Sequence, residues 1–116
     1  MSRKQALAEL IAKVEAGDFP TKWGDLNAAD VAHMSYGLPM KGSAWGAFHG
    51  SLDAAKALHE AVLPGWIYNL APGFAHVLPP HDNGDQEALT GLSDYPARAW
   101  LLAILRALHA QEGGEA

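Results

Sequence analysis

The sequence predicts an α/β fold, a single-domain layered α-β-α sandwich in which helices pack a small antiparallel sheet. The length of 116 residues is enough for one hydrophobic core and too short for two. Composition favours helix, with 22 Ala and 15 Leu against 4 Val and 3 Ile. Gly, Pro and Trp gather in residues 19–80, between two ends that have helical periodicity. We therefore expect residues 1–116 to form one domain with an irregular, aromatic-rich centre.

The first half of the chain contains one clear helical pattern, expected at about residues 2–16. Its apolar side chains recur at positions i, i+3, i+4 and i+7, and Gly17 is a natural C-terminal stop. A short helix is expected at about residues 27–36. Residues 40–50 include three glycines and are expected to form a loop or an irregular strand.

The second half begins with a helix expected at residues 51–63, capped by Ser51 and stopped by Pro64. A β-hairpin is expected at about residues 66–78, because two aromatic and β-branched runs flank the dipeptide Pro72-Gly73. Residues 81–93 are polar and are expected to form a surface loop.

The last helix is expected at residues 94–111 and is apolar on several sides. Either two layers of the same chain cover it, or a second subunit does. The second alternative is favoured, so the sequence predicts a homo-oligomer. The apolar side chains concerned are Ala97, Trp100, Leu101, Leu102, Ile104, Leu105 and Leu108.

Charge and composition exclude several classes of protein. A net charge of −5 argues against binding of a nucleic acid polymer, which requires a basic face. The chain has no Cys, which removes disulfides, thiolate zinc sites and cysteine nucleophiles. No apolar run approaches the roughly 20 residues that cross a bilayer, and the polar N-terminus is unlike a signal peptide. We expect a cytoplasmic protein that makes no membrane contact.

Three strings in the second half of the chain form a recognisable pattern: Gly50-Ser51-Leu52-Asp53-Ala54-Ala55, Leu63-Pro64-Gly65-Trp66 and Tyr95-Pro96-Ala97-Arg98-Ala99-Trp100. Through these strings the chain resembles the phage ABA sandwich domain family over about residues 50–110. This resemblance implies an α/β layered fold and a viral context, hence the cytoplasm of an infected bacterial host. It assigns no catalytic residue, and residues 1–50 form a variable N-terminal part outside it.

Six histidines raise the question of a metal site. His76, His81 and Asp82 lie within a short stretch, but loop and strand histidines are more often bonded to backbone or water than to zinc. The pair His59-Glu60 lacks the second histidine four residues after the first that a zincin helix requires. The sequence therefore predicts no metal and no cofactor.

Hydrolytic chemistry has weak support in the sequence. Ser43 lies in Gly42-Ser43-Ala44-Trp45-Gly46, where it is displaced by one position from the nucleophile elbow of hydrolases. His49 could serve as its base, yet no carboxylate is placed to orient that imidazole. The acids at positions 82, 85 and 87 are typical of a solvated loop. We expect a protein that is not an enzyme.

The strongest local feature is the run of residues 41–51, which supplies a cation, glycines, aromatic rings and a capped helix N-terminus. A helix N-terminus favours a phosphate, and aromatic faces stack on a nucleobase. The sequence predicts a small nucleotide-like ligand on these side chains together with a cation of the last helix. The candidate ligand-binding residues are Lys41, Ser43, Trp45, Phe48, His49, Ser51 and Arg98.

Three functions are compatible with this pattern. The first hypothesis is a phage-encoded protein that sequesters a nucleotide second messenger of host defence, of the cyclic ADP-ribose or cyclic dinucleotide type. The second is a phosphodiesterase-like enzyme that degrades such a nucleotide. The third is a phage interaction or accessory module without a small ligand.

Overall fold

A computed structural model of the chain describes residues 3–17, 38–79 and 88–113. The predicted α/β sandwich, its hairpin and its three principal helices are confirmed. The expected helix at residues 27–36 and the acidic loop at residues 82–87 lie outside the described residues. No described helix has the length and apolar character needed to span a membrane. The described elements are α1 (Arg3–Glu15), α3 (Leu38–Phe48), α4 (Leu52–Val62), β1 (Ile67–Ala71), β2 (Phe74–Leu78), β3 (Leu89–Leu92) and α5 (Pro96–Gly113).

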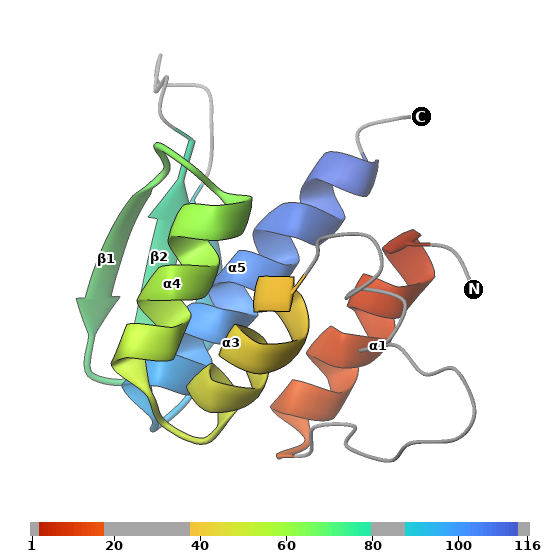
Figure 1. Cartoon of the computed structure of the whole chain (residues 1–116). Coiled ribbons are helices and arrows are strands. Elements are labelled where there is room, and N and C mark those ends of the chain that lie inside the picture. Colours follow the sequence, from red (N-terminus) through yellow and green to blue (C-terminus); the bar gives the residue numbers. More distant parts are fainter. Residues whose placement is uncertain (1–2, 18–37, 80–87, 114–116) are drawn as a thin grey trace.

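The sheet has three antiparallel strands in the order β1-β2-β3. Figure 1 shows β1 and β2 side by side. Pro72 and Gly73 connect β1 to β2, and Gly73 has φ +88°, as the third position of a type II turn requires. Strand β3 corrects the prediction of an unbroken loop at residues 81–93. Only four residues of that stretch pair with β2, and the polar residues before them hide the strand pattern.

The two faces of the sheet differ in burial. Ala75 and Val77 of β2 are fully buried on the inner face, which α5 covers. Ile67 and Leu92 lie on the outer face and are 48% and 66% exposed. Among the described residues, the helices therefore lie on one side of the sheet.

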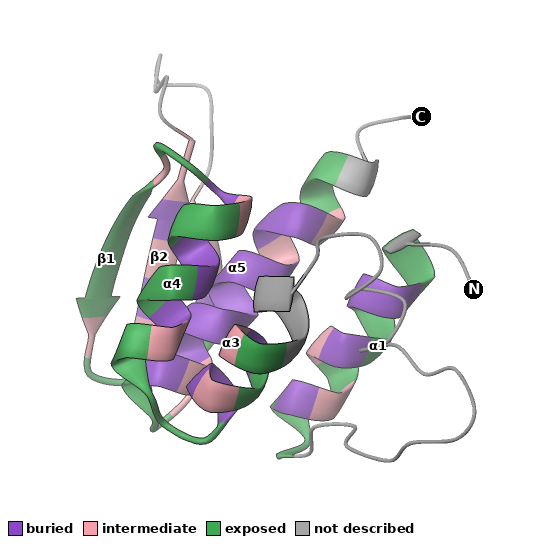
Figure 2. Ribbon diagram, in the orientation of Figure 1, coloured by how far each residue is buried: buried purple, intermediate pink, exposed green. Residues whose placement is uncertain are grey.

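Helix α5 forms the centre of the molecule, with the sheet on one side and α1 on the other (Figure 1), while α3 and α4 also contact it. In Figure 2, α5 is coloured purple along most of its length, which marks buried residues. Its apolar circumference is therefore covered by two layers of the same chain. The homo-oligomer stays a prediction, but the surface on which it was based is already covered within one subunit.

The prediction of a loop or an irregular strand at residues 40–50 is wrong, because residues 38–48 form helix α3. Ala44, Ala47 and Phe48 make a buried stripe at helical spacing. Gly46 serves close packing, because a Cβ on it would lie 2.8 Å from the Cβ of Ala54 in α4. This glycine therefore reflects helix–helix contact and not loop flexibility, which sequence periodicity alone does not distinguish.

Candidate functional site

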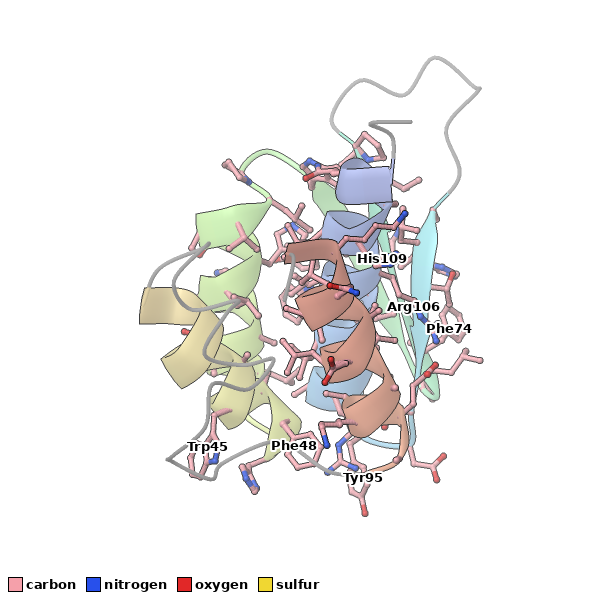
Figure 3. All side chains as sticks on the ribbon, turned by 90° about the vertical axis from the view of Figure 1, so that its right-hand side faces the viewer. Trp45, Phe48, Phe74, Tyr95, Arg106 and His109 are labelled. Carbon is pink, nitrogen blue, oxygen red and sulfur yellow. The ribbon has the colours of Figure 1, made fainter. Side chains whose placement is uncertain are left out.

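A continuous row of rings and one guanidinium lies at the end of the molecule where α3 stops and α5 begins. We call Trp45, His49, Phe48, Arg98 and Tyr95 the aromatic row. The ring centroids of Trp45 and His49 are 4.3 Å apart, and those of His49 and Phe48 are 5.1 Å apart. The Arg98 guanidinium carbon lies 4.1 Å from the Phe48 ring centroid and 4.7 Å from that of Tyr95. Figure 3 shows Trp45, Phe48 and Tyr95 at the same end of the molecule.

The two ends of the aromatic row face solvent, and of its members only Phe48 is buried. Trp45 is 48% exposed and Tyr95 is 58% exposed, whereas Phe48 is only 6% exposed. Phe48 therefore anchors the row in the core, and the indole and phenol offer open aromatic surface. Clustered exposed apolar groups of this kind mark interaction sites more often than scattered ones do.

Arg98 has a structural role within the row. Its Nε and Nη2 donate hydrogen bonds to the carbonyl oxygen of Phe48, at 3.3 and 3.2 Å. Phe48 is the last residue of α3, so the cation also stabilises the negative end of that helix dipole. Within the described part of the chain, Nη1 of Arg98 makes no hydrogen bond, so both of its N–H groups can donate to a ligand.

The substitution Arg98→Ala is expected to destabilise the fold by about 1–2 kcal/mol, because it removes the charged donors at the end of α3. Arg98→Lys keeps the charge without the planar fork, so it should recover part of this loss. Urea unfolding followed by circular dichroism measures both. If both variants unfolded at the urea midpoint of the wild type, the guanidinium would not stabilise the C-terminal end of α3.

The structure brings together some of the sequence-predicted site residues and separates others. Trp45, Phe48, His49 and Arg98 belong to the aromatic row. Ser43 is two positions before Trp45 in α3, which places it roughly 200° around the helix, away from the indole. Lys41 lies in the first turn of α3, about one helical turn before Trp45, and its side chain is outside the described residues.

Ser51 performs the capping role that the sequence predicts. Its hydroxyl oxygen accepts a hydrogen bond from the backbone N–H of Ala54 at 3.0 Å, at the N-terminus of α4. Gly50, with φ +102°, reverses the chain between α3 and this cap. The exposed carboxylate of Asp53 lies in the first turn of α4 and already complements its positive end. The cap is therefore structural first, and a ligand phosphate would have to share it.

Sequence reasoning did not include Tyr95 among the site residues. The signal was available, since Tyr95 and Arg98 are three positions apart at the start of a helix and therefore share a face. The contact of Arg98 with Phe48, by contrast, spans 50 positions and has no local signal.

A buried histidine forms a second polar cluster, away from the aromatic row. His59 of α4 is 2% exposed and lies 2.9 Å from the carbonyl oxygen of Trp66 through Nε2. The indole N–H of Trp100 donates to Nδ1 of His59 at 3.2 Å. Because an indole only donates, Nδ1 must accept and Nε2 must carry the proton. Both ring nitrogens are thus satisfied, and this histidine serves packing.

The described residues contain no group of three metal-ligating side chains. His76 is bonded to the hydroxyl of Thr90 at 2.9 Å, while its predicted neighbours His81 and Asp82 lie outside the described residues. His49 contacts two aromatic rings.

No protein-family model, no curated protein and no solved structure matches the chain. The resemblance to the phage ABA sandwich domain family therefore stays a prediction.

Proposed function

We propose that this chain is a non-catalytic binding protein for a small nucleotide-like ligand, and that the aromatic row holds the ligand. The observation that carries the proposal is the pair of exposed rings, Trp45 and Tyr95, at the two ends of a row with a guanidinium in it. A nucleobase stacks on such rings at about 1–3 kcal/mol each. The remaining donor of Arg98 would then contact a phosphate or ribose oxygen.

The charges near the row favour a ligand with few phosphates. Arg98 is the cation of the row, while Asp94 is next to Tyr95 in the sequence and is exposed. Asp53 is exposed in the first turn of α4. Each carboxylate repels a nearby phosphate, so a triphosphate would be disfavoured relative to a cyclic nucleotide. This argument supports cyclic dinucleotides and cyclic ADP-ribose isomers as the first ligands to test.

The biological role that we propose is sequestration of such a messenger during phage infection, so that host defence receives no signal. This part of the proposal rests on the sequence resemblance to the phage ABA sandwich domain family. Binding without cleavage is supported by His49, which packs against Trp45 and Phe48 and makes no hydrogen bond or ion pair with a described carboxylate. A protein that only sequesters a messenger has to bind it tightly, and this requires no catalytic group.

A nucleotide panel tests the proposal and separates it from its alternatives. The protein is incubated with cyclic dinucleotides, cyclic ADP-ribose isomers and nucleoside triphosphates, and its melting temperature is recorded. The proposal predicts a thermal upshift with a cyclic nucleotide that chromatography recovers intact. Altered products would instead support the phosphodiesterase. No shift at tens of micromolar of any ligand would contradict binding and favour the interaction module.

Trp45→Ala should weaken the affinity for the bound nucleotide by about 5- to 150-fold, the equivalent of one stacking contact of 1–3 kcal/mol. Trp45→Phe keeps an aromatic face and should retain most of the affinity. Both variants change an exposed side chain, so their melting temperatures without ligand should stay near that of the wild type. Calorimetry measures the affinities. If Trp45→Ala bound the nucleotide as tightly as the wild type, the indole of Trp45 would not be part of the binding site.

A further inference from the structure

Strand β1 is an edge of the sheet that the described residues leave open (Figure 1). Figure 2 shows it exposed along most of its length. Natural edge strands usually carry a charge, a proline or a bulge that prevents further pairing. The five residues of β1 have none of these, and no Asp, Glu, Lys or Arg occurs between residues 61 and 81. This edge therefore lacks the usual protection against a further strand.

The backbone groups of β1 alternate in direction. In a hairpin with a two-residue loop, the pair flanking the loop exchanges hydrogen bonds, and hydrogen-bonded pairs then alternate with non-bonded ones. Counting from the pair Ala71–Phe74, the residues whose N–H and C=O groups point away from β2 are Tyr68 and Leu70. Their side chains are each 39% exposed, although both lie on the inner face of the sheet.

These positions are self-complementary about the central residue of the strand. If a second β1 lies antiparallel with Asn69 opposite Asn69, then Tyr68 of each chain faces Leu70 of the other. Both residues have outward-directed backbone groups, so the two pairs can exchange all of their free hydrogen bonds. Ile67, which is 48% exposed, then lies opposite Ala71 on the outer face.

We propose that two copies of this chain associate through β1 in a two-fold antiparallel pairing centred on Asn69, which joins their sheets into one of six strands. Apolar side chains then meet on both faces around the central pair of Asn69 side chains, and the symmetry satisfies backbone donors and acceptors equally on both chains. The net charge of −5 on each subunit opposes association, but the uncharged stretch at residues 61–81 keeps those charges out of the strand contact. A second copy is therefore the partner that this edge fits.

A single introduced cysteine tests the register, because the chain has no cysteine of its own. In a non-bonded antiparallel pair the Cα atoms lie about 4.5 Å apart, which permits a disulfide. Asn69→Cys should form a covalent dimer rapidly on mild oxidation. Leu92→Cys is the matched control, because it is exposed on the same outer face but on the far strand β3, and it should form no disulfide-linked dimer. Failure of Asn69→Cys to crosslink, or equal crosslinking by Leu92→Cys, overturns the proposal.

Charge substitutions test the same contact without a covalent bond. Light scattering of the wild type should give a mass of twice 12.3 kDa. Asn69→Lys and Asn69→Asp should each be monomeric, because like charges would face each other across the two-fold axis, and an equal mixture should recover the dimer. Leu92→Lys should remain dimeric. A monomeric wild type, or a dimer that Leu92→Lys breaks and Asn69→Lys does not, contradicts pairing through β1.

Discussion

Replacing Gly91 with alanine is expected to destabilise the protein by at least about 3 kcal/mol, or to prevent folding. Gly91 lies in β3 where α5 crosses the sheet, and a Cβ there would meet the carbonyl oxygen of Ala99 at 2.0 Å and the backbone nitrogen of Ala103 at 2.7 Å. These are backbone atoms of a helix buried on several sides, so neither element can yield by a side-chain rotation. The melting temperature should fall by at least about 12 °C.

Gly42→Ala is the matched control for this substitution. Gly42 lies within helix α3 and does not have positive φ, and a Cβ added to it would meet no described heavy atom within 4 Å outside its own stretch of helix. Alanine in a helix is favoured over glycine by about 0.5–1 kcal/mol, so this variant should melt slightly above the wild type. Thermal unfolding by circular dichroism compares the two variants. A melting temperature of Gly91→Ala near that of Gly42→Ala would show that α5 does not pack directly on β3.

Loss of the buried imidazole is expected to have the second-largest effect on stability. His59→Leu keeps much of the volume but removes the partners of the Trp100 indole N–H and the Trp66 carbonyl. Each buried group left unsatisfied costs about 1–3 kcal/mol, so the free energy of unfolding should fall by about 2–6 kcal/mol. Urea unfolding at constant pH measures it.

A double-mutant cycle isolates the hydrogen bond from the packing. Trp100→Phe removes the indole donor, so His59→Leu should cost less in the Trp100→Phe background than in the wild type. The expected coupling is about 1 kcal/mol or more, since one unsatisfied group disappears in the double variant. Strict additivity of the two substitutions would show that the bond between Trp100 and His59 contributes nothing to the fold.

The parts of the fold that the sequence predicted were those governed by local rules. The cap at Ser51, the turn at Gly73 and the stripe of α1 each depend on residues within one or two turns of each other. Helix α3 was missed because Gly42 and Gly46 lower helix propensity locally, while the gain comes from close contact with α4, which is a tertiary effect.

The candidate site was predicted only in part. Trp45 and His49 were grouped because both lie in the run of residues 41–51, and they do lie together, since a helical spacing of four places them on one face. The meeting of Arg98 with Phe48 depends on how α5 crosses the end of α3, and no spacing in the sequence encodes it. Ser43 was grouped with Trp45 on the expectation of a flexible loop. Both residues belong to helix α3 instead, and a spacing of two places their side chains on different sides of it.

The measurement that tests the functional account most directly is a nuclear magnetic resonance titration of the four tryptophan indole N–H signals. Cyclic dinucleotides and cyclic ADP-ribose isomers are added in turn, and each ligand is recovered afterwards. The account predicts a saturable shift of the Trp45 indole signal, a smaller shift of the Arg98 Nε–H, an unchanged Trp100 signal and an intact ligand. Saturable shifts confined to residues outside the aromatic row, or no shift with any ligand at millimolar concentration, would contradict it.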